Sequence, residues 1–275
     1  MQRTLIALFR RLPIGLLYGV MALVIPFYML FGKGFRPSYR FFRKRMGMGP
    51  LPSFCHVYLN QFRMGQVVLD RFAAFAGKSF RMEVLELNVF EHLSAGDTGF
   101  IMLGSHTGCF EMVGYTLHSA KTVHALVFAG ETATVMENRR RLFDSMNIRM
   151  VPVTEDLSHI FALNGALADG EIVSMPGDRL FGSQKSLRCT FFGEKAAFPM
   201  GPFLLAVQRQ VPVLQVFVMK EGRRDYRVYL SEIPAPGEGT RQERMQRMAD
   251  AYAARLEEIV RRYPDQWFNF FDFWA

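Results

Sequence analysis

The chain has 275 residues, which is enough for one catalytic domain with an accessory segment. Half of the residues are hydrophobic, which is low for a polytopic membrane protein and high for a soluble enzyme, so we expect a globular domain with some membrane contact. The formal net charge of +8 is uneven: residues 1–69 hold ten Lys or Arg and no acidic residue, whereas the rest holds 23 basic and 25 acidic residues. Basic charge confined to one apolar end predicts binding to an anionic membrane surface and no binding to nucleic acid.

The N-terminal segment contains an uncharged run over residues 12–32. A helix of this length reaches across a hydrocarbon core of about 30 Å, and the run lacks the cleavage site of a removable signal peptide. Three basic residues precede it and six follow it by residue 45, which predicts that the bulk of the chain faces the cytoplasm. Pro13 and Pro26 leave open a helix that lies in one leaflet, and a buried helix of a soluble domain is the third interpretation. We predict an anchor with basic flanks over residues 1–45.

Residues 46–275 are predicted to form one α/β domain, in which strands alternate with helices around a largely parallel sheet. A helix over 51–76 comes before the first predicted strand, and a Pro- and Gly-rich loop over 232–240 leads to a long helix over 241–262. The aromatic tail over 267–274 suits the core, a docking flap or a membrane interface. The predicted strands cover residues 83–87, 100–103, 123–128, 148–153, 172–175, 213–219 and 226–230, and the other predicted helices cover 112–119, 132–146, 157–168 and 202–209.

A histidine and an acid lie at the end of the strand over 100–103, as Ser105-His106-Thr107-Gly108-Cys109-Phe110-Glu111. Ligands collect at the carboxyl ends of strands in open α/β sheets, so chemistry is expected here. A carboxylate on one imidazole nitrogen fixes the tautomer and leaves the other nitrogen to accept a proton from a hydroxyl. We therefore predict His106 as a general base and Glu111 as the residue that orients it.

Two comparisons test this motif within the chain itself. His92 and Asp97 have the same spacing, but they read as the end of a helix and a surface turn, so they serve as an internal control. Cys109 is the alternative nucleophile, although a reactive thiolate needs a cationic neighbour and access. The three cysteines match neither a disulfide framework nor a zinc site, and there is no Gly-rich nucleotide loop. We expect a reducing compartment, no metal and no cofactor.

Together with the anchor and the histidine motif, several later segments resemble the bacterial lipid A late acyltransferase family, which is related to the glycerolipid acyltransferases. The matching segments are Pro176-Gly177-Asp178-Arg179, Phe191-Phe192-Gly193, Phe198-Pro199-Met200-Gly201-Pro202, the strand over 211–218 and Pro264-Asp265-Gln266-Trp267.

The resemblance implies a fold, a site and partners. The fold is one glycerolipid-acyltransferase-like α/β domain with a hydrophobic groove for the acyl chain. The family's dyad falls on His106 and Glu111, and its later acidic-basic turn on Asp178 and Arg179. Acyl carrier protein is the implied donor and a membrane lipid the acceptor, at the inner membrane of a bacterium.

The residues around this turn receive substrate-binding roles. Arg179 can hold a phosphate by paired charge-assisted bonds, with Asp178 and Gly177 positioning it at a strand end; a structural turn is the alternative. Two roles are open for Phe198, Pro199 and Gly201: they form part of the substrate entrance, or they form only a turn before a helix.

The reaction expected is transfer of a fatty acyl group from a thioester to a lipid hydroxyl or amine. Two alternatives stay open: aminoacyl transfer to lipid A from a carrier protein, and a non-catalytic membrane adaptor. The sequence leaves the acceptor, the chain length, carrier protein against coenzyme A, and the oligomeric state undecided.

Overall fold

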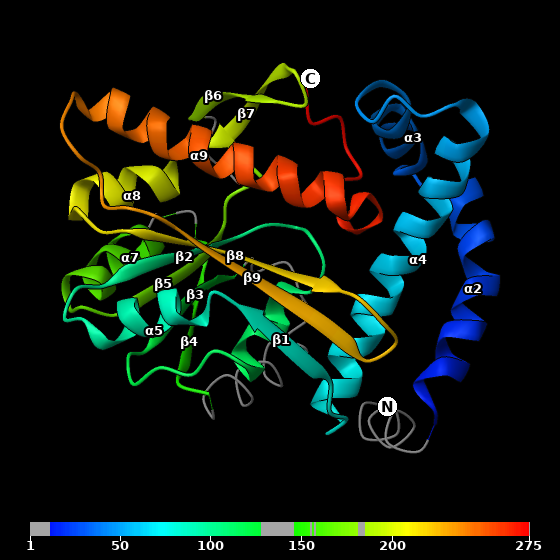
Figure 1. Ribbon diagram of the computed structural model, residues 1–275, viewed down its shortest axis with the longest axis horizontal. Helices are drawn as coiled ribbons and strands as arrows, with labels where there is room; N and C mark the ends of the chain where they lie inside the picture. The colour runs from blue at the N-terminus through cyan, green and yellow to red at the C-terminus, as the bar shows by residue number, and fades with distance from the viewer. Residues whose placement is uncertain (1–11, 128–145, 155, 157, 181–184, 275) are drawn as a thin grey trace.

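A seven-stranded sheet forms the centre of the computed structural model, which describes residues 12–127, 146–154, 156, 158–180 and 185–274 (Figure 1). Its strands are β1 (Arg81–Leu85), β2 (Phe100–Gly104), β3 (Val123–Val127), β4 (Ile148–Pro152), β5 (Ile172–Pro176), β8 (Val213–Lys220) and β9 (Asp225–Ile233). They lie in the order β1-β9-β8-β2-β5-β3-β4. Neighbouring strands run parallel except β8 and β9, which are antiparallel. The predicted α/β fold with a largely parallel sheet is confirmed.

The two central strands are buried along their whole length. All five residues of β2 and all eight of β8 are shielded from solvent. Their near-continuous apolar sequence follows from this position, because a parallel sheet with both faces covered needs apolar side chains on both sides. The carboxyl end of β2, where His106 follows, therefore emerges from the middle of the sheet.

Helices cover both faces of the sheet and create two hydrophobic cores. One core joins the sheet to α7 (Ser158–Ala168), α8 (Gly201–Arg209) and α9 (Arg241–Arg262). The other contains α5 (Leu87–Ala95) and the short 3-10 helix η1 (Phe110–Tyr115). The helix α9 begins where Thr240 and Glu243 bond each other's backbone N–H groups, which satisfies donors that the first helical turn leaves open.

Three N-terminal helices pack along one side of this body (Figure 1). They are α2 (Ile14–Phe31), α3 (Phe35–Lys44) and α4 (Pro50–Phe75), and both α2 and α3 contact α4. Within the described part of the chain, no helix has the length and apolar character that crossing a membrane requires. The division into an anchor over 1–45 and a domain over 46–275 stays a prediction.

Several local predictions differ from the structure. The segment predicted as an α-helix over 112–119 is η1, which is shorter and begins at Phe110. The sequence did not reveal the hairpin of β6 (Ser186–Phe191) and β7 (Glu194–Pro199). Its two-residue turn has positive φ at Phe192 and Gly193, and the usual asparagine signal is absent because Phe192 takes the first position. The helix predicted over 132–146 lies almost wholly outside the described residues. In the aromatic tail, Trp267 and Phe273 are buried in the core.

Candidate functional site

The loop that carries His106 is tightly held on both sides. A Cβ at Gly104 would lie 2.4 Å from the Phe110 ring, and one at Gly108 would lie 1.9 Å from the carbonyl oxygen of Val218. Gly108 also has φ of +50°, which favours glycine. The Phe268 N–H donates to the His106 carbonyl at 2.8 Å. The loop therefore has little freedom, and His106 has a fixed place.

The side chain of Asp178 meets His106 at the end of the neighbouring strand. In the parallel pair β2–β5, Gly104 lies opposite Pro176, and each functional residue follows two positions later. The Nδ1 atom of His106 lies 2.7 Å from Oδ1 of Asp178, and the His106 backbone N–H donates to Oδ2 at 2.9 Å. An ionised carboxylate can only accept, so Nδ1 donates, and Nε2 is left as the basic nitrogen.

The Asp178 carboxylate is fully enclosed, with 1% of its side chain exposed. Burial opposes its ionisation, but the charge of His106, the two bonds from His106 and the charge of Arg179 together hold its pKa below the ordinary value. The indole N–H of Trp267 lies 3.4 Å from Oδ2. A buried, ionised carboxylate can hold the ring and balance the charge of an imidazolium.

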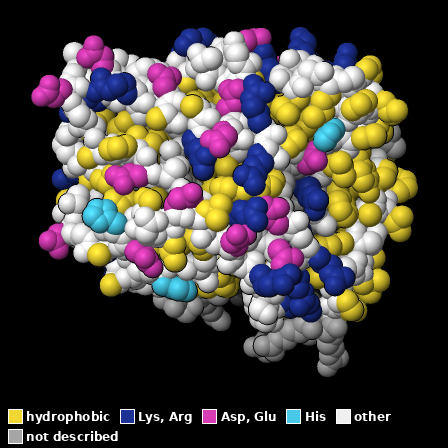
Figure 2. Space-filling view, viewed as in Figure 1, with side chains coloured by type: hydrophobic (Ala, Val, Ile, Leu, Met, Phe, Trp, Pro, Cys, Tyr) yellow, Lys and Arg dark blue, Asp and Glu magenta, His cyan; other side chains and the backbone are white. Residues whose placement is uncertain are grey.

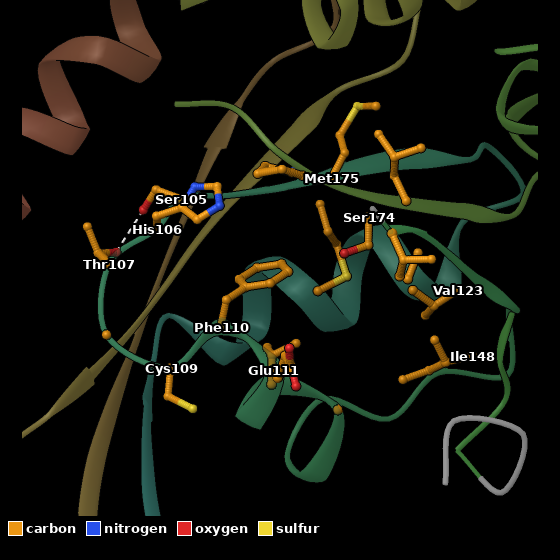
Figure 3. A pocket seen from close by; sticks show the side chains of 18 of the residues that line it. Ser105, His106, Thr107, Cys109, Phe110, Glu111, Val123, Ile148, Ser174 and Met175 are labelled. Carbon is orange, nitrogen blue, oxygen red and sulfur yellow. Dashed lines mark hydrogen bonds between the residues drawn. The ribbon is translucent and has the colours of Figure 1, made fainter. Parts of the chain in front are cut away.

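Glu111 has a different immediate partner. Its Oε1 atom accepts a 2.8 Å bond from Arg71 of α4, and both side chains are partly exposed. Figure 3 shows the imidazole and the Glu111 side chain on either side of the Phe110 ring. The sequence predicted that Glu111 orients His106, whereas the carboxylate that bonds Nδ1 is that of Asp178. Arg71 carried no signal in the sequence, because only folding brings α4 beside the histidine loop.

A cavity of about 550 Å³ adjoins these groups. Its walls come from α4, the histidine loop, η1 and the ends of β3, β4 and β5. Most of the side chains that line it are apolar. Such a volume with few polar groups suits an apolar ligand whose reacting end is fixed by those groups. The polar and charged side chains in the wall belong to Arg71, Ser105, His106, Thr107, Glu111, Ser119, Lys121, Ser174 and Arg179.

Arg179 lies at the same end of the cavity. One terminal nitrogen donates to the Phe268 carbonyl at 2.5 Å, and the guanidinium lies 5.6 Å from the centre of the Phe271 ring. Its Nε is buried and has no hydrogen-bond partner among the described residues. Burial lowers the pKa of Arg179 and the charge of Asp178 opposes that shift. Arg179 is thus held in place at the wall of the cavity.

The other predicted substrate-binding residues lie elsewhere. Gly177 packs under the Tyr252 ring, where a Cβ would lie 2.8 Å from it. Phe198 is fully buried among the rings of Phe191, Tyr252 and Phe273. Pro199 ends β7 and Gly201 begins α8. None of the four belongs to the described wall of the cavity, and substrate contact by them stays a prediction.

The remaining candidate groups also have a clear environment. Cys109 is buried, and burial followed by the charge of Glu111 raises the pKa of its thiol, which opposes a thiolate nucleophile. His92, the internal control, is exposed on α5. Within the described ranges, no group of three or more His, Cys, Asp and Glu side chains is placed to hold a metal ion.

The His106–Asp178 pair beside an apolar cavity lies in a part of the chain that matches a known protein family. A family model described as bacterial lipid A biosynthesis acyltransferase matches residues 74–275. The chain belongs to this family. No curated protein sequence gives a significant match. The match to this acyltransferase family begins at residue 74, so the α4 residues that line the cavity, Met64, Val67, Val68 and Arg71, lie outside the matched region.

Proposed function

We propose that the protein transfers a fatty acyl group from an acyl thioester to a hydroxyl or amine of a membrane lipid, such as lipid A or a related glycolipid or aminolipid. Family membership supports acyl transfer to a lipid. The observation that carries the proposal is the imidazole of His106, held by the buried Asp178 carboxylate at the wall of a mostly apolar cavity. An imidazole held in this way beside a mostly apolar cavity supports a role for His106 as a base next to a bound acyl chain.

The proposed step uses His106 as general base and then as general acid. Nε2 takes the proton from the acceptor O–H or N–H while that oxygen or nitrogen forms a bond to the thioester carbonyl carbon. The tetrahedral intermediate collapses as its carbon–sulfur bond breaks, and the leaving sulfur takes the proton from Nε2. Asp178 stays ionised and balances the imidazolium, as its lowered pKa permits.

We assign to Arg179 the stabilisation of negative charge on the carbonyl oxygen or on a substrate phosphate. Its guanidinium is anchored to the Phe268 carbonyl and lines the cavity. A donor held in a partly buried position needs little reorganisation, so it stabilises negative charge effectively. The Arg71–Glu111 pair also contributes charge to the wall, and we assign to it a role in holding the substrate near the imidazole.

Acyl carrier protein is the proposed donor, and its docking site is the basic end of α3. Arg43 and Lys44 are exposed there, whereas Arg40 pairs with Asp272 and Arg45 with Glu194. The two exposed cations support attraction of an acidic carrier, which weakens as salt rises. The proposed location is the bacterial inner membrane, with the catalytic body on the cytoplasmic side.

Loss of a lipid mass increment tests the reaction. The gene is deleted, and total lipid extracts are compared by mass spectrometry with strains that carry the wild-type gene or His106→Ala. Loss of one fatty acyl increment from a lipid, restored by wild type only, supports the proposal. Loss of an aminoacyl increment, such as glycyl, would contradict fatty acyl transfer, and an unchanged lipid profile would indicate the non-catalytic adaptor.

A purified assay tests the donor. Transfer from acyl carrier protein is compared with transfer from acyl-coenzyme A over a range of ionic strength. We expect a preference for the carrier that falls at high salt and is lost in Arg43→Glu/Lys44→Glu. The control is Arg209→Glu/Arg241→Glu, which reverses two exposed charges on α8 and α9. Equal use of both donors at every salt concentration would rule out the proposed preference for the carrier.

A further inference from the structure

The helix α2 has two apolar faces and no charged residue. One face, with Ile14, Tyr18, Ile25 and Met29, is buried against the protein. The other face exposes large apolar side chains at helical spacing, and Phe31 is 85% exposed. A helix that faces water on one side normally carries polar residues there. The exposed face is formed by Leu16, Val20, Leu23, Val24, Phe27, Tyr28 and Phe31.

A buried polar cluster fixes the first part of α2 to the catalytic body. The Lys220 ammonium lies 2.5 Å from the Asp70 carboxylate, and both side chains are completely buried. The hydroxyls of Tyr18 and Tyr226 also bond this carboxylate. Four elements therefore meet at one point, namely α2, α4, β8 and β9. Moving α2 away would take the Tyr18 hydroxyl, one of its hydrogen-bond donors, from the buried Asp70 carboxylate, and a buried charged acceptor that loses a donor is destabilised.

The rest of α2 is fixed as well. The hydroxyl of Tyr58 on α4 donates to the Ala22 carbonyl in the middle of α2 at 3.1 Å. Near the end of α2, Ile25 and Met29 join the core that contains Phe42. The helix is thus attached to α4 at its beginning and in its middle, and to the core that contains Phe42 near its end. The other side of α4 lines the cavity. To cross a bilayer, α2 would therefore have to separate from α4 and from this core.

The exposed face of α2 continues onto its neighbour and ends in positive charge. Leu51 and Phe54 of α4 are 72% and 50% exposed, and Figure 2 shows apolar side chains along the side of the molecule where α2 and α4 lie. Lys33 and Arg36 are exposed immediately after α2. An apolar face flanked by cations matches the chemistry of an anionic phospholipid surface.

We propose that α2 lies in the plane of one leaflet of a phospholipid bilayer, with its exposed face in the interfacial layer, and stays packed on α4. This inference rests on the proposed action on a membrane lipid. It places the cavity about one helix diameter, on the order of 10 Å, from α2, because only α4 separates the two. A lipid acceptor can then reach His106 while its acyl chains remain in the leaflet.

Spin labels on α2 test its orientation. Leu16, Leu23 and Phe31 are changed singly to Cys in a Cys55→Ser background, since Cys55 is the exposed native thiol and the other two are buried. Depth is measured by collision with oxygen and a nickel complex in vesicles of phosphatidylethanolamine and phosphatidylglycerol. We expect the three labels at one depth. A spanning helix would place position 23 about 10 Å deeper than position 16, because each residue rises about 1.5 Å, and that result would overturn the proposal.

Vesicle sedimentation tests the exposed face itself. Phe27→Lys should lower binding by about tenfold or more, whereas Phe161→Lys, which changes another well exposed phenylalanine, on α7, should not. Binding should be tighter to phosphatidylglycerol vesicles than to phosphatidylcholine alone. Equal binding by both variants, or dimerisation of the protein in place of vesicle binding, would overturn the proposal. Transfer to a detergent-solubilised acceptor is measured in parallel, because it reports on the proposed reaction independently of docking.

Discussion

Replacing Asp178 by Asn removes the charge that faces the imidazole while it keeps the shape of the side chain. The carboxylate is fully buried and accepts both the ring and the backbone N–H of His106. Removing one partner of a buried, hydrogen-bonded charge pair costs about 2–5 kcal/mol. If this cost falls on the imidazolium of the transition state, kcat drops by about 30- to 5,000-fold, since each 1.36 kcal/mol is about tenfold. The expected value lies in the upper part of this range because the Asp178 carboxylate itself is shielded from solvent.

The assay is steady-state transfer from acyl carrier protein to a lipid acceptor, with Glu111→Gln measured beside Asp178→Asn. Glu111 pairs with Arg71, so we expect Glu111→Gln to raise KM and to lower kcat less than Asp178→Asn does. If Glu111→Gln cost more in kcat, and Asp178→Asn stayed within about tenfold of wild type, Glu111 would be the orienting residue and the structural assignment would be refuted.

Unfolding measurements provide a control for the same variant. The pKa of Asp178 in the folded protein lies below its ordinary value. Its carboxylate therefore stabilises the fold above the pKa of the unfolded chain, and this contribution disappears as pH falls through the folded-state pKa. The difference in unfolding free energy between wild type and Asp178→Asn should shrink as pH falls from about 6 to about 3. A difference that grew on acidification would contradict the ionised state of Asp178.

Two further changes test the site and the fold. His106→Ala should remove transfer activity, a loss of at least about a hundredfold, while the exposed control His92→Ala keeps it; an essential His92 in the purified assay would place the site elsewhere. Lys220→Met should lower the free energy of unfolding in urea by about 3–5 kcal/mol, because it leaves the buried Asp70 carboxylate without its cation. The double variant Lys220→Met/Asp70→Asn should lose less unfolding free energy than the single variant. Equal losses by the single and double variants would argue against a charge pair.

The sequence by itself determined the α/β class and the place of the reactive histidine. The buried strands β2 and β8 are recognisable because both faces of the sheet are covered, so their side chains are apolar without alternation. His106 follows such a strand through a glycine turn, and function collects at strand ends in this class of fold. These are local features, and a local pattern of residues suffices to predict them. The hairpin of β6 and β7 escaped prediction because Phe192 takes a turn position where asparagine is usual.

Only the tertiary structure decided which groups surround the histidine. Spacing favoured Glu111, five residues from His106, whereas the carboxylate on Nδ1 comes from Asp178, 72 residues later in the chain. Pairing of β2 with β5 brings these two residues together, and packing of α4 brings Arg71 to Glu111. The apolar N-terminal run is a similar case: its composition permits a spanning, an in-plane or a buried helix. Its contacts with Asp70 and Tyr58, and its place in the core that contains Phe42, support the proposed in-plane helix, because the free energy of a helix depends on what each of its faces meets.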